Sequence, residues 1–112
     1  MLIYKIFRAG EWAVLNKDGV TKGAPLDLID GFVHLSTAAQ AAATATKHFT
    51  HEDNLILLAL EANTLGGDLK WEPSREGSLF PHLYRAVHLD DILWSKPLPR
   101  VNGVHQFPTQ ML

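Results

Sequence analysis

One histidine stands inside a short apolar segment that leads into two hydroxyl residues. His34 lies within the apolar stretch 32–35 and is followed directly by Ser36 and Thr37. The free N–H groups and the dipole at a helix start favour an anionic or oxygen-rich ligand. We therefore expect His34 to be a catalytic residue and Ser36 and Thr37 to bind ribose hydroxyls or a phosphate. The alternatives are a core histidine bonded to a backbone carbonyl and hydroxyls that only cap the helix.

Two later segments carry side chains suited to the same ligand. His82 and Tyr84 alternate along an extended stretch and so project from one face, and the Tyr84 ring can stack on a base or a nicotinamide. Glu72 follows Trp71 and can serve as a general base or stabilise a developing cation on a sugar. We expect His82 and Glu72 to be catalytic and Trp71 and Tyr84 to contact the ligand. The competing interpretation places the aromatic residues and His82 in the core and leaves Glu72 as an exposed carboxylate.

A metal site is a weaker possibility. His34, His82 and Glu72 would make a set of two histidines and one carboxylate, but nothing in the sequence shows that they converge. His48 and His51 stand near the expected end of a helix, where the dipole favours a protonated histidine without any metal. We therefore expect no metal. The glycine-rich phosphate loop, the Gly-x-Ser-x-Gly elbow and the His-Glu-x-x-His helix are all missing from the sequence.

Short strands are expected to hold most of these side chains. Alternating or continuous apolar character predicts strands over residues 2–7, 32–35, 55–60, 69–72, 79–87 and 92–95. The run 55–60 is apolar throughout, which is typical of a central strand covered on both faces. A short helix or turn is expected at 11–17, before the turn pair Asp18-Gly19, and one helical turn within a loop is expected near Asp27.

The clearest helix signal follows directly after His34. Thr37 and Gln40 match the capping box, in which the two side chains bond to each other's backbone N–H groups. A helix is therefore expected from Ala38. One face of this helix is nearly all alanine and carries Ala41, Ala42, Ala45 and Phe49. Because long helices do not alternate with the strands, the pattern favours an antiparallel or mixed α+β sheet.

Composition limits the classes of protein to which the chain can belong. Its 112 residues, 46% hydrophobic and 20% charged, suit one domain over 1–112, with an irregular C-terminal tail over 98–112. The absence of cysteine excludes disulfides and thiolate chemistry and fits a reducing cytoplasm. A net charge of −2 argues against binding to duplex nucleic acid. The N-terminus predicts a strand rather than a signal peptide, and no apolar run is long enough to span a membrane.

Three segments together resemble a known family. They are residues 30–40 (Asp-Gly-Phe-Val-His-Leu-Ser-Thr-Ala-Ala-Gln), 69–72 (Leu-Lys-Trp-Glu) and 80–84 (Phe-Pro-His-Leu-Tyr). In this order they identify the chain as resembling the small bacterial proteins of domain of unknown function 952, and the match covers nearly the whole length. The resemblance implies an ADP-ribosyltransferase-like fold, a split antiparallel or mixed sheet with flanking helices. It brings no established activity.

A more distant resemblance suggests a ligand. Residues 33–36 (Val-His-Leu-Ser) are similar to a stretch of the tRNA 2′-phosphotransferases and, in shape, to the Gly-Ile-Tyr-Phe-Ala-Ser strand of poly-ADP-ribose polymerases. On that alignment His34 replaces the tyrosine that stacks on nicotinamide, and Ser36 keeps the hydroxyl. The expected function is binding of NAD or a related ribonucleotide in a cleft, with cleavage at the ribose anomeric carbon if the protein is an enzyme. The alternative is a non-catalytic module that binds a peptide or an anion.

Overall fold

The largest sheet of the protein has four antiparallel strands. The structure is a computed structural model that describes residues 1–74 and 76–111. The strand order is β4 (Ser36–Thr37), β1 (Leu2–Arg8), β5 (Leu55–Glu61) and β9 (Ile92–Leu98). As its continuous apolar run predicted, β5 lies between two other strands, and the side chains from Leu57 to Leu60 are fully buried.

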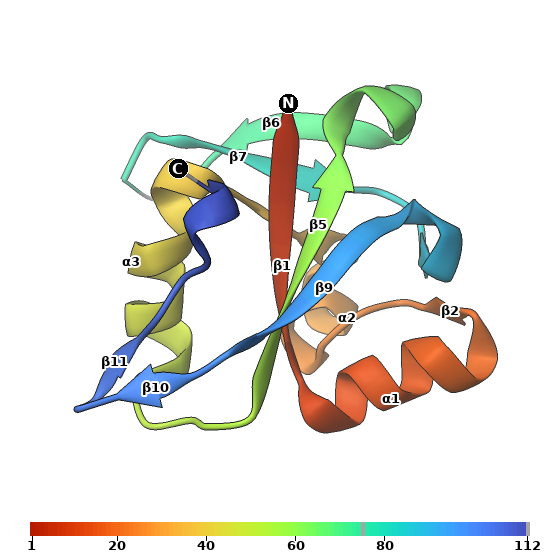
Figure 1. The fold of residues 1–112 in the computed structure, drawn as a ribbon. Helices are drawn as coiled ribbons and strands as arrows, with labels where there is room; N and C mark the ends of the chain where they lie inside the picture. The colour runs from red at the N-terminus through yellow and green to blue at the C-terminus, as the bar shows by residue number, and fades with distance from the viewer. Residues whose placement is uncertain (75, 112) are drawn as a thin grey trace.

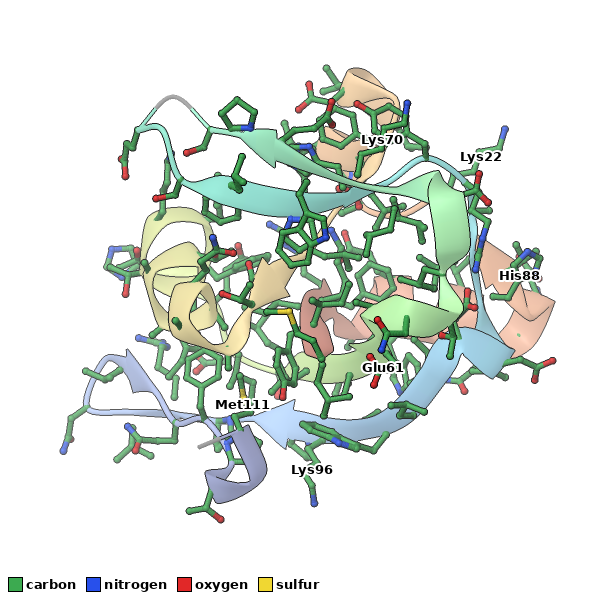
Figure 2. All side chains as sticks on the ribbon, turned by 90° about the horizontal axis from the view of Figure 1, so that it is seen from above. Lys22, Glu61, Lys70, His88, Lys96 and Met111 are labelled. Carbon is green, nitrogen blue, oxygen red and sulfur yellow. The ribbon has the colours of Figure 1, made fainter. Side chains whose placement is uncertain are left out.

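A second sheet has three antiparallel strands and carries the histidines. Its order is β3 (Val33–His34), β7 (Leu79–Leu83) and β6 (Leu69–Pro73). Viewed from above, β6 and β7 lie on one side of the molecule and β9 lies on the opposite side, with side chains filling the space between them (Figure 2). The molecule is therefore layered, and the second sheet forms one outer layer.

Three α-helices flank the sheets, which confirms the α+β class (Figure 1). The helix α1 (Ala9–Asp18) ends at Gly19 with φ 74°, and α2 (Pro25–Asp30) ends at Gly31 with φ 82°. Both φ values lie in the left-handed region that glycine adopts without steric cost, so these glycines fix the two helix ends. The predicted helix after His34 is α3 (Ala38–Phe49), and it has the expected capping box. None of the helices in the described ranges is long and apolar enough to cross a membrane.

The two faces of β1 belong to two different hydrophobic clusters. Ile3 and Phe7 point into the cluster that contains Val33 and Leu83 of the second sheet. Tyr4 points into the other cluster, which α3 covers with Ala45 and Phe49. Of the four α3 residues predicted to share the buried face, Ala41, Ala45 and Phe49 are buried and Ala42 is exposed. Lys5 alternates with Tyr4 along the strand and therefore points toward the second sheet.

The segment predicted as one strand over 32–35 is divided between the two sheets. Val33 and His34 pair with β7, whereas Ser36 and Thr37 pair with β1. Leu35 lies between the two short strands, and its N–H donates to the carbonyl of Pro81 at 3.0 Å. The chain changes partner here because β1 and β7 lie in different layers. Hydrophobic alternation does not reveal this change, since it reports which residues are buried and not which strand they pair with.

The C-terminal stretch is more regular than the irregular tail predicted for 98–112. The strands β10 (Arg100–Val101) and β11 (Val104–His105) form a hairpin, and a 3₁₀ turn spans Thr109–Met111. Phe107 packs against the cluster under α3. The remaining short elements are the paired strands β2 (Val20–Thr21) and β8 (Val87–His88) and the 3₁₀ turns Ala62–Thr64, Gly66–Asp68 and Leu89–Asp91.

Replacing Thr37 should destabilise α3 without unfolding the protein. The Gln40 N–H donates to the Thr37 hydroxyl at 3.3 Å, and the Thr37 N–H donates to the Gln40 side chain at 3.0 Å. Loss of such a cap costs about 1 kcal/mol. Urea denaturation of Thr37→Ala should show this loss, and Thr37→Ser, which keeps the hydroxyl, should retain most of the stability. Equal stability of both variants and the wild type would contradict a capping role.

Candidate functional site

Strand pairing brings the predicted catalytic residues onto one face of the second sheet. His34 lies directly opposite His82, and His82 lies opposite Lys70 on the third strand. Cross-strand partners share a face, and alternation adds Glu72 to the same face. Tyr84, just beyond β7, reaches Glu72 as well. We call the group His34, Glu72, His82 and Tyr84 the polar face.

A single carboxylate oxygen joins the three residues at one end of the polar face. Glu72 Oε1 lies 2.9 Å from His82 Nδ1 and accepts a hydrogen bond from the Tyr84 hydroxyl at 2.6 Å. These two hydrogen bonds lower the pKa of Glu72, and the bond to Glu72 raises the pKa of Tyr84. At neutral pH the site therefore holds a carboxylate beside a neutral phenol. Glu72 Oε2 makes no hydrogen bond to a residue that the structure describes.

An aromatic ring packs across the middle of the polar face. Phe32 stacks on the His82 imidazole with 4.1 Å between ring centroids. Its ring centroid is also 4.6 Å from that of His34 and 5.2 Å from that of Tyr84. The two imidazoles meet edge to face at 5.4 Å. Phe32 thus sets the spacing of the polar groups and provides apolar surface among them.

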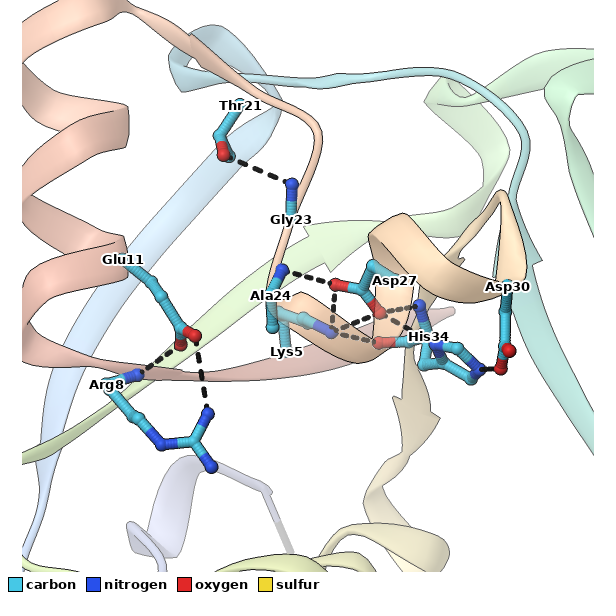
Figure 3. Close-up of polar contacts among 9 residues, drawn as sticks. All are labelled: Lys5, Arg8, Glu11, Thr21, Gly23, Ala24, Asp27, Asp30 and His34. Atoms are coloured by element: carbon cyan, nitrogen blue, oxygen red, sulfur yellow. Dashed lines mark hydrogen bonds and ion pairs between the residues drawn. The ribbon is translucent and has the colours of Figure 1, made fainter.

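His34 is held between two aspartates of α2 (Figure 3). Its Nδ1 lies 2.7 Å from Asp27 Oδ1, and its Nε2 lies 2.9 Å from Asp30 Oδ2. Because a carboxylate cannot donate, the bond to Asp27 places a hydrogen on Nδ1 and fixes the orientation of the ring. Asp30 is exposed, whereas Asp27 is buried. A ligand that bonds to His34 Nε2 would therefore compete with Asp30.

Asp27 is the centre of a buried polar network beneath His34. Lys5 Nζ lies 2.8 Å from Asp27 Oδ2 and donates to the His34 carbonyl at 2.9 Å. The backbone N–H groups of Ala24 and His34 donate to the two Asp27 oxygens at 2.8 and 3.0 Å. Burial alone would raise the pKa of Asp27, but the hydrogen bond from His34 and the charge of Lys5 lower it to about 2. Burial lowers the pKa of Lys5, and Asp27 opposes that effect.

Gly23 leaves room for the Asp27 carboxylate. Its φ is +107°, and a Cβ at this position would collide with the Asp27 side chain. A side chain here would be strained and would also displace a buried ionised group. The loop before α2 therefore needs glycine for both conformation and space.

Three of the predicted site residues are not part of the polar face. The Ser36 hydroxyl is buried and lies 3.0 Å from the Thr44 hydroxyl of α3. Thr37 caps α3, as the alternative interpretation predicted, whereas Ser36 bonds to a hydroxyl within α3 and does not cap the helix. Trp71 pairs with Pro81 and lies on the opposite face of β6 from Glu72. The ligand contacts predicted for Ser36, Thr37 and Trp71 therefore have no support from the geometry.

Lys5, Asp27 and Asp30 support His34, and the sequence did not predict these contacts. A lysine inside the apolar strand Ile3–Phe7 was the available signal, because a buried charge requires a partner. Asp27 and Asp30 gave no comparable signal, since acidic residues on a short helix are usually solvated. In the described part of the chain, His, Asp and Glu side chains form no group of three or more that could hold a metal ion.

Acid should weaken the fold through Asp27. The pKa of Asp27 is about 2 in the folded protein, against an ordinary value of 3.8. As the pH falls, Asp27 is therefore protonated in the unfolded chain before it is protonated in the folded protein. The ionised carboxylate then contributes on the order of 2 kcal/mol above about pH 4, and this contribution is lost as the pH falls to about 2. The free energy of unfolding, measured with urea across this pH range, should fall with falling pH in the wild type and should fall less steeply in Asp27→Asn. A carboxyl ¹³C titration of the wild type with an Asp27 midpoint near the ordinary value would contradict the prediction.

The chain matches one protein family and three solved structures. The family is described as protein of unknown function (DUF952) and matches residues 6–95. The crystal structure of CC0527 from Caulobacter crescentus is 45% identical, with a TM-score of 0.94 over 99% of this chain and 98% of that chain. Its solution NMR structure is 47% identical, with a TM-score of 0.85 over 94% of this chain and 91% of that chain. No curated protein matches the chain.

These comparisons identify the family of the chain but give no information about its activity. The family description states that the function is unknown, and the names of the similar structures mention no activity or ligand. The ADP-ribosyltransferase-like fold and the NAD ligand therefore stay predictions. The resemblance read from the three sequence segments is confirmed at the family level: the chain belongs to the DUF952 family of proteins of unknown function.

Proposed function

We propose that this protein binds NAD or a related ribonucleotide at the polar face. The observation that carries the proposal is the convergence of His82 and Tyr84 on one oxygen of Glu72. Vicinal ribose hydroxyls are donors that suit an ionised carboxylate, and such charge-assisted hydrogen bonds are stronger than neutral ones. The second oxygen of Glu72 is directed to no described residue, so it is the natural acceptor for a hydroxyl of the ligand.

The surroundings of Glu72 provide the other features that a nucleotide needs. Tyr84 is 40% exposed, so part of its ring is open to stacking. Lys70 is exposed, and its Nζ lies 5.0 Å from the centroid of the Tyr84 ring. An ammonium at this position can bind a phosphate beside the ribose. Acceptor, aromatic surface and cation thus lie within one small area.

Catalysis at this site would use Glu72. In cleavage of NAD, the bond between the ribose anomeric carbon and the nicotinamide nitrogen breaks, and its electron pair leaves with the nicotinamide. The sugar becomes an oxocarbenium ion, which a neighbouring carboxylate stabilises until water adds and loses a proton. Glu72 is ionised at neutral pH because its pKa is lowered by Tyr84 and His82. His34 would act as a positioning residue, since both of its ring nitrogens contact aspartates.

Binding should be tested with NAD, ADP-ribose and AMP, followed by amide NMR shifts. We expect shifts at Phe32, His82 and Tyr84, and a rise of about tenfold in Kd for Glu72→Gln, the size of one lost charge-assisted hydrogen bond. Glu76→Gln makes the same chemical change at an exposed position outside the polar face and should bind like the wild type. If none of the three ligands moves these amides, the proposal is wrong.

Turnover should be measured on the same proteins. If the protein cleaves NAD, nicotinamide release should fall to background in Glu72→Gln, while the melting temperature stays near that of the wild type because this side chain is partly exposed. Binding without any release of nicotinamide would assign the polar face to recognition alone. That result would support the binding proposal and remove the catalytic one.

A further inference from the structure

A cavity of about 230 Å³ lies beside the polar face. Its walls are mostly apolar and come from the end of α2, from β3 and from the end of β7 with the turn that follows it. The apolar lining consists of Leu28, Phe32, Val33, Leu83, Tyr84 and Ala86. Ligand pockets commonly measure ~300–1,000 Å³, so this cavity has room for part of a ligand and not for a whole dinucleotide.

Two aromatic residues connect the cavity to the polar face: Tyr84 belongs to both, and Phe32 lines the cavity and packs on the polar face. Phe32 stacks on His82, and Tyr84 donates to Glu72, yet both side chains also line the cavity. A ligand bound at Glu72 can therefore continue into the cavity over these two rings. Such a ligand needs a part with several hydroxyls joined directly to a flat apolar part. A nucleoside has this composition.

The charged groups around the cavity favour a neutral occupant. The Arg85 guanidinium lines the cavity, but it binds both oxygens of Asp91 at 2.8 and 3.0 Å. The Asp27 carboxylate is neutralised in the same way by Lys5. Lys22 is exposed and stands where water screens its charge. An uncharged aromatic ring therefore fits this space better than a phosphate or a carboxylate.

Gly31 contributes backbone and no side chain to the wall of the cavity. Gly31 lines the cavity, and a Cβ built on this residue would meet no atom within 4 Å. Its φ of +82° favours glycine, so the left-handed end of α2 also keeps a side chain out of this space. The helix end thus leaves the cavity accessible beside Phe32.

We propose that this cavity is the subsite for the neutral heteroaromatic base of a nucleoside whose ribose binds Glu72. The inference rests on the proposed function and adds to it the part of the ligand that confers specificity. Stacking on Phe32 and Tyr84 and burial of the ring against Leu28 and Ala86 would provide the binding free energy. The ribose and any phosphate would remain at the polar face.

The test compares AMP, adenine and ribose 5-phosphate as probes. We expect intermolecular NOEs from the adenine ring protons to the methyl groups of Leu28 and Ala86 with AMP and with adenine. Ala86→Leu adds bulk to the cavity wall and should weaken AMP binding at least about tenfold, with ribose 5-phosphate unchanged. Ala43→Leu makes the same change at an exposed position on α3 and should bind AMP like the wild type.

The outcomes separate this inference from the proposed function. If AMP and ribose 5-phosphate bind equally well and the NOEs to Leu28 and Ala86 are missing, the base lies outside the cavity, and only this inference is wrong. If no probe shifts the amides of His82 and Tyr84, the proposed function is wrong as well. Should Ala86→Leu fail to fold, the NOEs on the wild type decide the question alone.

Discussion

The ion pair between Lys5 and Asp27 is the interaction on which the rest of the site depends. It joins the middle of β1 to α2 in the interior, and the same lysine and the same aspartate both bind His34 of β3. Removing one partner of a buried pair typically costs about 3–5 kcal/mol, because the other charge is left without compensation. Three elements that are distant in the sequence are therefore held in one arrangement, and His34 is oriented from the interior of the protein through Asp27 as well as by the exposed Asp30.

The two histidines of the polar face differ in how they are held. Asp27, which holds His34, is buried, whereas Glu72, which holds His82, is more accessible to water, as is Tyr84, which donates to Glu72. Charge interactions between accessible groups are screened by dissolved ions, whereas buried ones are screened much less. The position of His34 is consequently fixed by the fold. Glu72 can exchange an internal hydrogen bond for one to a ligand at a small cost in free energy. This division is common in sites where rigid elements position a more adaptable contact surface.

Much of the fold was predictable because hydrophobic periodicity and capping act locally. The apolar run of β5, the Thr37–Gln40 capping box and the Asp18-Gly19 helix end all appear where the sequence placed them. The convergence of His34, His82, Glu72 and Tyr84 was predicted only in part. The prediction came from the family resemblance and from the alternation that places His82 and Tyr84 on one face of a strand. Their common face depends on strand register, which requires the pairing of His34 with His82, 48 positions away, together with the shorter-range pairing of β6 with β7. Trp71 differs from these residues for a local reason, since adjacent residues of a strand point to opposite faces and Trp71 is next to Glu72 in β6.

The division of residues 33–37 between two sheets has a consequence for how the layers move. Within five residues the chain pairs first with β7 and then with β1, and the next residue begins α3. This crossing links the outer layer to the central sheet next to His34. Local opening of the outer layer near His34 must therefore pull on the start of α3, so the two layers cannot loosen independently at this end. Ligand binding at the polar face would therefore change the protection of the α3 backbone amides against hydrogen exchange, although α3 lies on the far side of the central sheet from the ligand.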